Sequence, residues 1–154
     1  DRMVKDSVVL DLDEHFTLDE FFSRISGPLG LDLDMKSETI FELLKERENE
    51  SSTAISSFVS IPHIILENTE TLHMMIVRCH GGVSFSETEN SIKAIFLIVG
   101  NEGERVLHLR LLASIATLVQ EKEFEKKWLD AKDINHLRDM ILLSSRKRFP
   151  KSGE

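Results

Sequence analysis

The sequence predicts an α/β domain in which helices cover both faces of a mixed β-sheet. Two runs, 72–79 and 92–99, are almost continuously apolar, as strands buried on both faces are. Amphipathic helical patterns lie before and after this central group of strands. Because a sheet that is apolar on both faces needs a helical layer on each side, we expect a three-layer sandwich.

The chain opens with a strand and a helix. Residues 8–12, VVLDL, are rich in β-branched side chains and predict a short strand. Thr17, followed three residues later by Glu20, forms a capping-box pattern that predicts a helix through Ile25. The Gly27-Pro28 pair is expected to end that helix.

A second helix is expected from Ser37 to about Glu48, because its apolar residues share one face at helical spacing. These residues are Ile40, Phe41, Leu43 and Leu44. After a polar segment, residues 58–66 form an apolar, β-branched run that contains Pro62. This run predicts a strand that ends or bends at the proline.

The two central strands are followed by helices. A turn is expected at 80–82, His-Gly-Gly, after the first of these strands. A loop at 100–103 leads into a long helix from about Glu104 to Val119. Asp133 is placed to cap a last helix. The expected order is strand, helix, helix, three strands, helix, helix.

Size and composition indicate one domain over residues 1–154, large enough for its own hydrophobic core. A single cysteine, Cys79, cannot form an internal disulfide, which favours the cytoplasm. The net charge of −8 disfavours nucleic acid as a partner, and no run of apolar residues is long enough to insert into a membrane. Because the chain starts at Asp1 rather than Met, we expect a domain of a longer protein or a processed or trimmed chain.

His63, which follows Pro62, is the first candidate for chemistry. Histidine has two ring nitrogens and a pKa of about 6.5, so it can accept and pass on a proton or a phosphoryl group at neutral pH. Proline favours a strand end, and strand ends at a sheet edge are where α/β folds place ligand sites. The other interpretation is a histidine packed among the neighbouring isoleucines.

Arg47, Ser52 and Thr53 precede His63 in the same stretch of chain. A guanidinium near a histidine can hold phosphoryl oxygens in a bidentate fork and stabilise charge during in-line transfer. The alternative for Arg47 is a surface arginine paired with a glutamate of its own helix. The hydroxyls of Ser52 and Thr53 can donate to a phosphoryl group or cap the turn.

His108 lies at the start of an apolar stripe on the predicted long helix, with Leu112, Ile115 and Val119. A histidine in this position is usually a satisfied core residue, but it approaches His63 if this end of the helix borders the sheet edge. No spacing resembles a zinc site, and glycine-rich phosphate loops are absent from the sequence. We therefore expect neither a metal nor another cofactor.

Taken together, these residues resemble the enzyme IIA domains of the bacterial sugar phosphotransferase system, of the mannitol/fructose and nitrogen-regulatory type. The resemblance covers nearly the whole chain. It rests on the segments VVLDL, LLKERE, ST.I...V.IPH, KAIFLIV and HL.LLA.IA. It implies the same fold as the hydrophobic pattern, a mixed sheet flanked by helices.

In that family the histidine of the IPH motif takes a phosphoryl group from the histidine phosphocarrier protein. It then passes the group to a permease component or acts as a regulatory signal. The resemblance makes His63 the phosphoryl acceptor, with Arg47 and His108 as its neighbours. It implies a cytoplasmic phosphotransferase, or the cytosolic domain of a membrane protein, whose partner is the phosphocarrier or a permease or transporter domain.

Three residues depart from the family pattern. Ala54, Ser56 and Phe58 stand where the family usually has glycine. Glycine permits positive φ and lets backbone N–H groups approach a phosphate closely. These departures support a second hypothesis, a regulatory or sensor domain that does not transfer phosphate and is attached to a membrane transporter or a transcription regulator.

Overall fold

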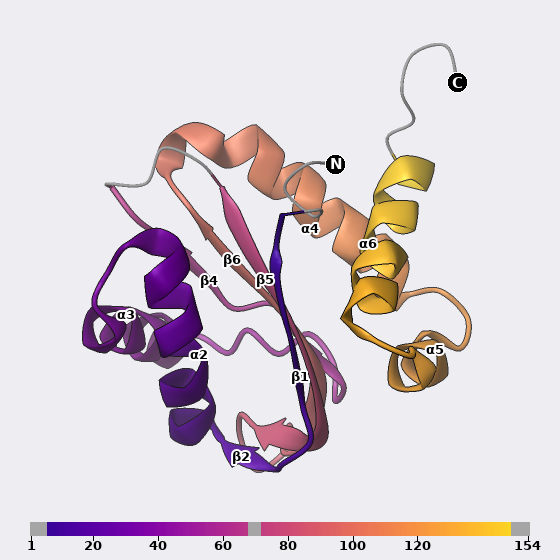
Figure 1. Ribbon diagram of the computed structural model, residues 1–154, viewed down its shortest axis with the longest axis horizontal. Coiled ribbons are helices and arrows are strands. Elements are labelled where there is room, and N and C mark those ends of the chain that lie inside the picture. The colour runs from indigo at the N-terminus through magenta and orange to yellow at the C-terminus, as the bar shows by residue number, and fades with distance from the viewer. Residues whose placement is uncertain (1–5, 68–71, 149–154) are drawn as a thin grey trace.

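The computed structural model describes residues 6–67 and 72–148 and contains a mixed sheet between two helical layers (Figure 1). The strand order is β1-β5-β6-β3, with β2 also paired to β5 and β4 also paired to β6. The strands are β1 (Val8–Leu12), β2 (Phe16–Thr17), β3 (Val59–Ser60), β4 (His63–Ile65), β5 (His73–Ser84) and β6 (Ile92–Gly100). Only β5 and β6 are antiparallel to each other, and the remaining pairs are parallel.

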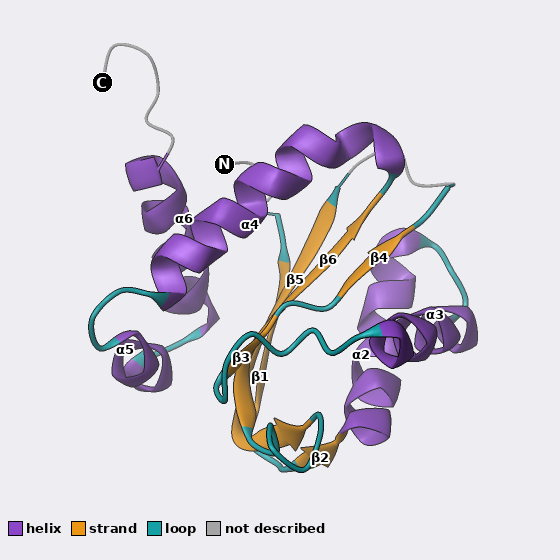
Figure 2. Ribbon diagram, turned by 180° about the vertical axis from the view of Figure 1, so that it is seen from behind, coloured by secondary structure: helices purple, strands orange, loops and turns teal. Residues whose placement is uncertain are grey.

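The helices divide between the two faces of the sheet, as Figure 2 shows from behind. The helices α2 (Leu18–Leu33) and α3 (Ser37–Glu50) cover one face. The helices α4 (Arg105–Val119), α5 (Phe124–Asp130) and α6 (Ile134–Arg148) cover the other. The predicted three-layer sandwich is confirmed. None of the helices in the described residues is long and apolar enough to cross a membrane.

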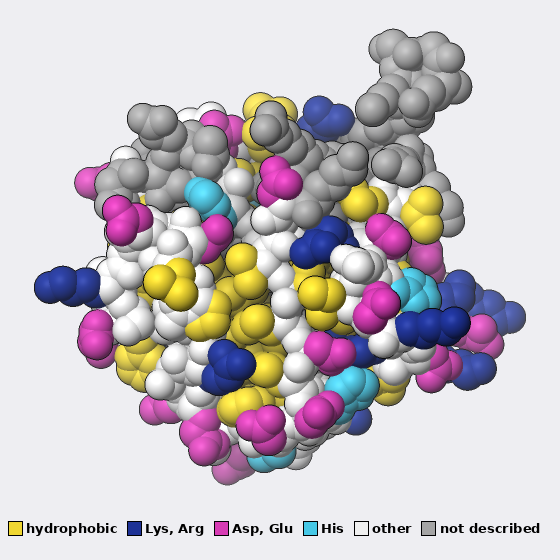
Figure 3. Space-filling model, in the orientation of Figure 1, with side chains coloured by type: hydrophobic (Ala, Val, Ile, Leu, Met, Phe, Trp, Pro, Cys, Tyr) yellow, Lys and Arg dark blue, Asp and Glu magenta, His cyan; other side chains and the backbone are white. Residues whose placement is uncertain are grey.

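The central strands supply a core to each layer because their side chains alternate between the two faces. Ile76 and Phe96 pack under α4, α5 and α6, whereas Val77 and Leu97 pack under α2 and α3. All four side chains are fully buried. On the face seen in Figure 3, charged side chains of both signs surround an apolar area in the middle.

The predicted end of the first helix is wrong, because α2 continues through Pro28 to Leu33. The predicted beginning is confirmed, since Thr17 and Glu20 form both hydrogen bonds of a capping box. A proline inside a helix costs roughly 3 kcal/mol through its missing N–H and its steric clash. The burial of Ile25 and Leu29 on either side of Pro28 offsets that local cost.

The turn predicted at 80–82 is also wrong. β5 runs without interruption from His73 to Ser84, with a register shift against β6 between Arg78 and Val83. Its two glycines allow other segments of the chain, at Glu14 and Ser91, to approach the strand closely. A Cβ on Gly81 would lie 2.3 Å from the carbonyl of Glu14, and Gly82 has a φ of 82°. The Gly-Gly pair therefore marks a bulge in a long strand.

The other boundaries agree with the sequence patterns, except that β2 and the short helix α5 were not predicted. The run 58–66 divides at Pro62 into β3 and β4. A single 3-10 turn, Glu102–Glu104, precedes α4. At the start of α6, the carboxylate of Asp133 accepts the backbone N–H of His136 at 2.9 Å, as expected of a cap.

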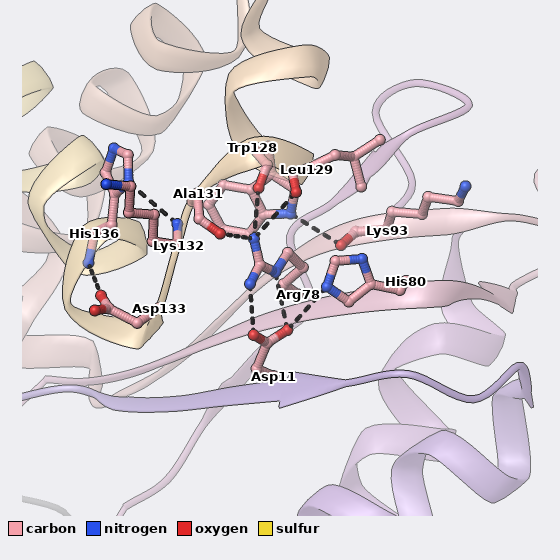
Figure 4. Close-up of polar contacts among 10 residues, drawn as sticks. All are labelled: Asp11, Arg78, His80, Lys93, Trp128, Leu129, Ala131, Lys132, Asp133 and His136. Atoms are coloured by element: carbon pink, nitrogen blue, oxygen red, sulfur yellow. Dashed lines mark hydrogen bonds and ion pairs between the residues drawn. The ribbon is translucent and has the colours of Figure 1, made fainter.

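The helix α5 is held to the sheet by a buried arginine (Figure 4). Arg78 on β5 is 3% exposed and donates to the backbone carbonyls of Trp128 and Ala131 at 3.0 and 2.7 Å. Its other nitrogens bond the carboxylate of Asp11 on β1, with Nε at 2.9 Å. A cation at the end of a helix also suits the negative end of the helix dipole. One side chain thus joins β1, β5 and α5.

We expect Asp11→Asn to lower the free energy of unfolding by about 1–2 kcal/mol, because Arg78 stays buried and loses its charged partner. The hydrogen bond from Arg78 holds the pKa of Asp11 below its ordinary value. The carboxylate therefore stabilises the fold fully above a pH of about 4 and loses this effect as the pH falls through its folded pKa. Urea unfolding at neutral pH and near pH 3 measures both effects. The matched control is Asp13→Asn, at an exposed position two residues along. Equal losses in the two variants would contradict this role of Asp11.

Candidate functional site

His63 begins β4 at the edge of the sheet, directly after the break at Pro62. It pairs with Ile98 of β6, whose side chain belongs to the core under α4. The next residue, Ile64, is buried on the opposite side, under α2 and α3. Alternation therefore directs the half-buried imidazole of His63 toward the α4 side of the edge.

Arg47, on the last turn of α3, contacts the Nε2 atom of His63 with two guanidinium nitrogens. Nε lies 3.4 Å and Nη2 lies 3.2 Å from it. The third nitrogen, Nη1, donates to the carbonyl and the hydroxyl of Ser51 at 3.1 and 3.3 Å. The contacts with Ser51 hold the guanidinium plane, so that its other two nitrogens lie against the imidazole.

These contacts define the tautomer of His63. Arginine only donates hydrogen bonds, so Nε2 of His63 must be the unprotonated nitrogen that accepts. The Nδ1 atom lies 3.3 Å from the carbonyl oxygen of Ile61, which only accepts, so Nδ1 carries the proton. The free electron pair of His63 is therefore on Nε2, directed at the guanidinium of Arg47.

His108, in the first half of α4, completes the group. Its ring centroid lies 5.6 Å from that of His63, with the ring planes at 67°. Its Nε2 atom is buried and has no hydrogen-bond partner among the described residues. Burial, followed by the nearby charge of His63, lowers the pKa of His108 below its ordinary value. At neutral pH this imidazole is therefore uncharged.

The structure places Ser52 and Thr53 in the loop after α3, where other groups of the chain engage both hydroxyls. Thr53 is 5% exposed and donates its hydroxyl to Glu48 at 2.7 Å. The hydroxyl of Ser52 accepts the N–H of Ala54 at 3.2 Å. Their role as phosphoryl ligands stays a prediction. His63, Arg47 and His108 are the predicted residues that the structure brings into contact.

The three residues at the usual glycine positions fit without backbone strain. None of Ala54, Ser56 and Phe58 has a positive φ. Phe58 is buried in the core with its ring perpendicular to that of Phe124, at a centroid distance of 6.1 Å. Its side chain therefore adds to the core under α5.

Sequence reasoning missed two residues that shape the site. Ser51 orients the guanidinium of Arg47, and Glu48 binds Thr53. The spacing of four from Arg47 to Ser51, next to the end of a helix, is a weak signal for the first contact. Glu48 lies within the LLKERE segment that carries the family resemblance, but nothing in that motif indicates its contact with Thr53. In the described residues, no group of His, Cys, Asp and Glu is arranged to hold a metal ion.

Comparison with known proteins identifies the family of the chain. Residues 4–143 match the family model described as phosphoenolpyruvate-dependent sugar phosphotransferase system, EIIA 2. The chain belongs to this family. It is 32% identical over 112 residues to the mannitol-specific phosphotransferase enzyme IIA component of Bacillus subtilis, which covers 71% of this chain and 76% of that protein. It is 29% identical over 105 residues to a nitrogen regulatory protein of Bradyrhizobium diazoefficiens, covering 68% and 69%.

A solved structure shows the same fold for an EIIA domain of low sequence identity. The nitrogen regulatory protein IIA-Ntr from Neisseria meningitidis superposes with a TM-score of 0.80 at 19% identity, covering 92% of this chain and 99% of that one. The family resemblance in the sequence is therefore confirmed. The chain is an EIIA-type domain related to sugar-phosphotransferase and nitrogen-regulatory IIA proteins.

The contact between the two histidines predicts that His63 influences the pKa of His108. We expect His108 to titrate below the ordinary range of histidine, and His63→Gln to raise its pKa part of the way, because that change removes the nearby charge and leaves the burial. A pH series of NMR spectra of the histidine ring protons measures this. His136→Gln, on α6, is the control and should leave His108 unchanged. A His108 pKa that is the same with and without His63 would exclude the coupling.

Proposed function

We propose that His63 accepts a phosphoryl group on Nε2 from a phosphorylated histidine of the histidine phosphocarrier protein. The observation that carries this is the unprotonated Nε2 atom, 3.2 Å from Nη2 of Arg47. The lone pair of Nε2 attacks phosphorus, the bond from phosphorus to the donor's ring nitrogen breaks, and that nitrogen recovers its electron pair. The proton on Nδ1 of His63 stays on that nitrogen throughout, donated in the hydrogen bond to the carbonyl of Ile61.

Arg47 supplies the positive charge for this step. The two guanidinium nitrogens that now contact Nε2 are placed to move onto two phosphoryl oxygens as the new bond forms. In phosphoryl transfer, a protein contributes mainly position and charge stabilisation. His108 is uncharged and has its Nε2 atom free of protein partners in the described residues, so it offers one more polar group beside His63.

The loop before β3 offers few backbone N–H groups to a phosphoryl group, because most of them already bond other atoms of the chain. The hydroxyl of Ser56 accepts the N–H groups of Phe58 and Val59 at 3.1 and 3.0 Å. The carbonyl of Val59 accepts those of Ile55 and Ser56 at 2.9 and 3.4 Å. The side chains of Arg47 and His108 therefore carry the stabilisation that backbone amides often supply.

The surface near His63 suits a protein partner. Five large apolar side chains are exposed on the elements that flank it: Ile55, Ile65, Val106, Leu107 and Leu109. They lie in the loop after α3, on β4 and on the first half of α4. Apolar surface of this kind beside a reactive group favours transient docking of a second protein. The phosphocarrier is the proposed donor, and a permease or transporter domain is the proposed recipient.

A regulatory domain without transfer activity is the second candidate. The observation in its favour is the loop at 53–59, most of whose N–H groups already have hydrogen-bond partners. Both candidates use the same fold, and they differ in whether a phosphoryl group reaches His63.

Incubation with the phosphorylated phosphocarrier is expected to give an acid-labile phosphoryl adduct, which His63→Ala abolishes because it removes the accepting nitrogen. Intact-protein mass spectrometry before and after acid treatment measures the adduct. His136→Ala, which removes a histidine of α6, should be labelled like the unaltered protein. Absence of an adduct on the unaltered protein, where a standard enzyme IIA domain is fully labelled, would reject the carrier function and favour the regulatory one.

Arg47→Gln is expected to lower the rate of transfer to His63 by roughly a hundredfold, because the developing charge loses its cation. Arg47→Lys should recover part of the rate, since it keeps the charge but loses the fork. Rapid-quench labelling measures these rates. The control is Arg24→Gln at an exposed position of α2, which should have no effect. An unchanged rate in Arg47→Gln would exclude this role of the guanidinium.

A further inference from the structure

Glu48 is the residue next to Arg47 on α3, and its carboxylate is bound to the loop that follows the helix. One carboxylate oxygen accepts the backbone N–H of Thr53 at 2.9 Å. The other accepts the hydroxyl hydrogen of Thr53 at 2.7 Å. Because both donors come from one buried residue, the two bonds fix the position of Thr53 relative to α3.

The hydrogen bonds continue from Thr53 to the imidazole of His63. The carbonyl of Thr53 accepts the backbone N–H of Ile61 at 3.0 Å. The carbonyl of Ile61 accepts the Nδ1–H of His63 at 3.3 Å. The neighbouring residues are paired as well: Ala54, after Thr53, forms an antiparallel β-bridge with Ser60, before Ile61. Ile61 is therefore bonded to Thr53 through its N–H and to His63 through its carbonyl, which connects the anchored residue to the imidazole.

Two adjacent residues of α3 thus act on the two ring nitrogens of His63. Arg47 contacts Nε2 directly, and Glu48 reaches Nδ1 through Thr53 and Ile61. A histidine whose second nitrogen is held by a carbonyl has a fixed tautomer and ring orientation. Without that acceptor, the tautomer and the orientation of the ring depend on Arg47 alone, whose two contacts with Nε2 are 3.4 and 3.2 Å long, so the proton moves to Nε2 more readily.

We propose that Glu48 is a positioning residue for His63: by anchoring Thr53, it holds the Ile61 carbonyl that keeps the proton on Nδ1 and the electron pair on Nε2. Glu48 does not contact the reacting atoms. Its effect on the tautomer of His63 can be measured in the protein without a phosphoryl group. Its effect on the rate of transfer rests on the phosphoryl-carrier function proposed above. The tautomer and the transfer rate are therefore two separate readouts.

The primary test is the ¹⁵N spectrum of the histidine side chains, recorded at a pH where His63 is neutral. In the unaltered protein we expect His63 to show a protonated Nδ1 and an unprotonated Nε2. Glu48→Ala should move both shifts toward the values of a mixed tautomer population. Glu48→Gln should restore much of the difference, because its amide can still accept from and donate to Thr53. Glu50→Ala, at an exposed position on the same helix, should change nothing.

Thr53→Val is the second variant, for the case in which Glu48→Ala does not fold. It preserves the shape of a buried side chain and removes the hydroxyl that bonds Glu48. The change in the ¹⁵N shifts of His63 should have the same direction and be smaller, since the N–H of residue 53 still donates. Thermal unfolding of each variant establishes that it is folded at the temperature of the NMR measurement.

In the transfer assay, we expect Glu48→Ala to slow labelling of His63 roughly ten- to a hundredfold, the usual effect of losing a residue that orients a reacting group. Glu48→Gln should lose less. A folded Glu48→Ala or Thr53→Val protein whose His63 shifts match those of the unaltered protein would overturn the proposal, whatever its transfer rate. If the shifts move as expected while the unaltered protein itself takes no phosphate, the positioning role stands and the carrier function fails.

Discussion

Pro62 has no N–H to donate to β6, although its carbonyl accepts the N–H of Ile98 at 2.9 Å. The edge of the sheet therefore pairs with β6 before and after the proline, and the pairing is interrupted at the proline itself. The interruption separates β3 from β4 and makes His63 the first residue of a short edge strand. From that position the imidazole reaches Arg47 on one helical layer and His108 on the other, so the site depends on this break in the ladder.

Much of the fold follows from local patterns. The capping box, the Asp133 cap and the apolar runs of β5 and β6 each depend on residues close in sequence, and the structure contains all of them. The continuation of α2 through Pro28 could not be predicted in this way, because it depends on burial of Leu29 against other elements. The continuation of β5 through Gly81 likewise depends on the backbone of Glu14, which is distant in the sequence.

The candidate site also has a part that the sequence predicts and a part that depends on contacts between distant residues. His63, Arg47 and His108 have chemically distinctive side chains, and the motif around them indicates the family, so the sequence alone was sufficient to select them. The surroundings that decide how they act were not predictable. The proton on Nδ1 depends on a backbone carbonyl, and the buried hydroxyl of Thr53 depends on Glu48. The substitution of glycine by Phe58 is accommodated by Phe124, a residue of the helix that was not predicted.

The arginine that holds α5 also bears on how the chain can be shortened. Arg78 lies in the centre of the sheet, but the carbonyls that solvate its charge belong to residues 128 and 131. A chain cut before α5 would keep every strand and the ion pair with Asp11, but the guanidinium would lose the carbonyls of Trp128 and Ala131 and the helix that covers it. The strands are therefore not an independent folding unit. The last third of the chain, which contains no strand among the described residues, completes the hydrogen bonding of a guanidinium that belongs to the sheet.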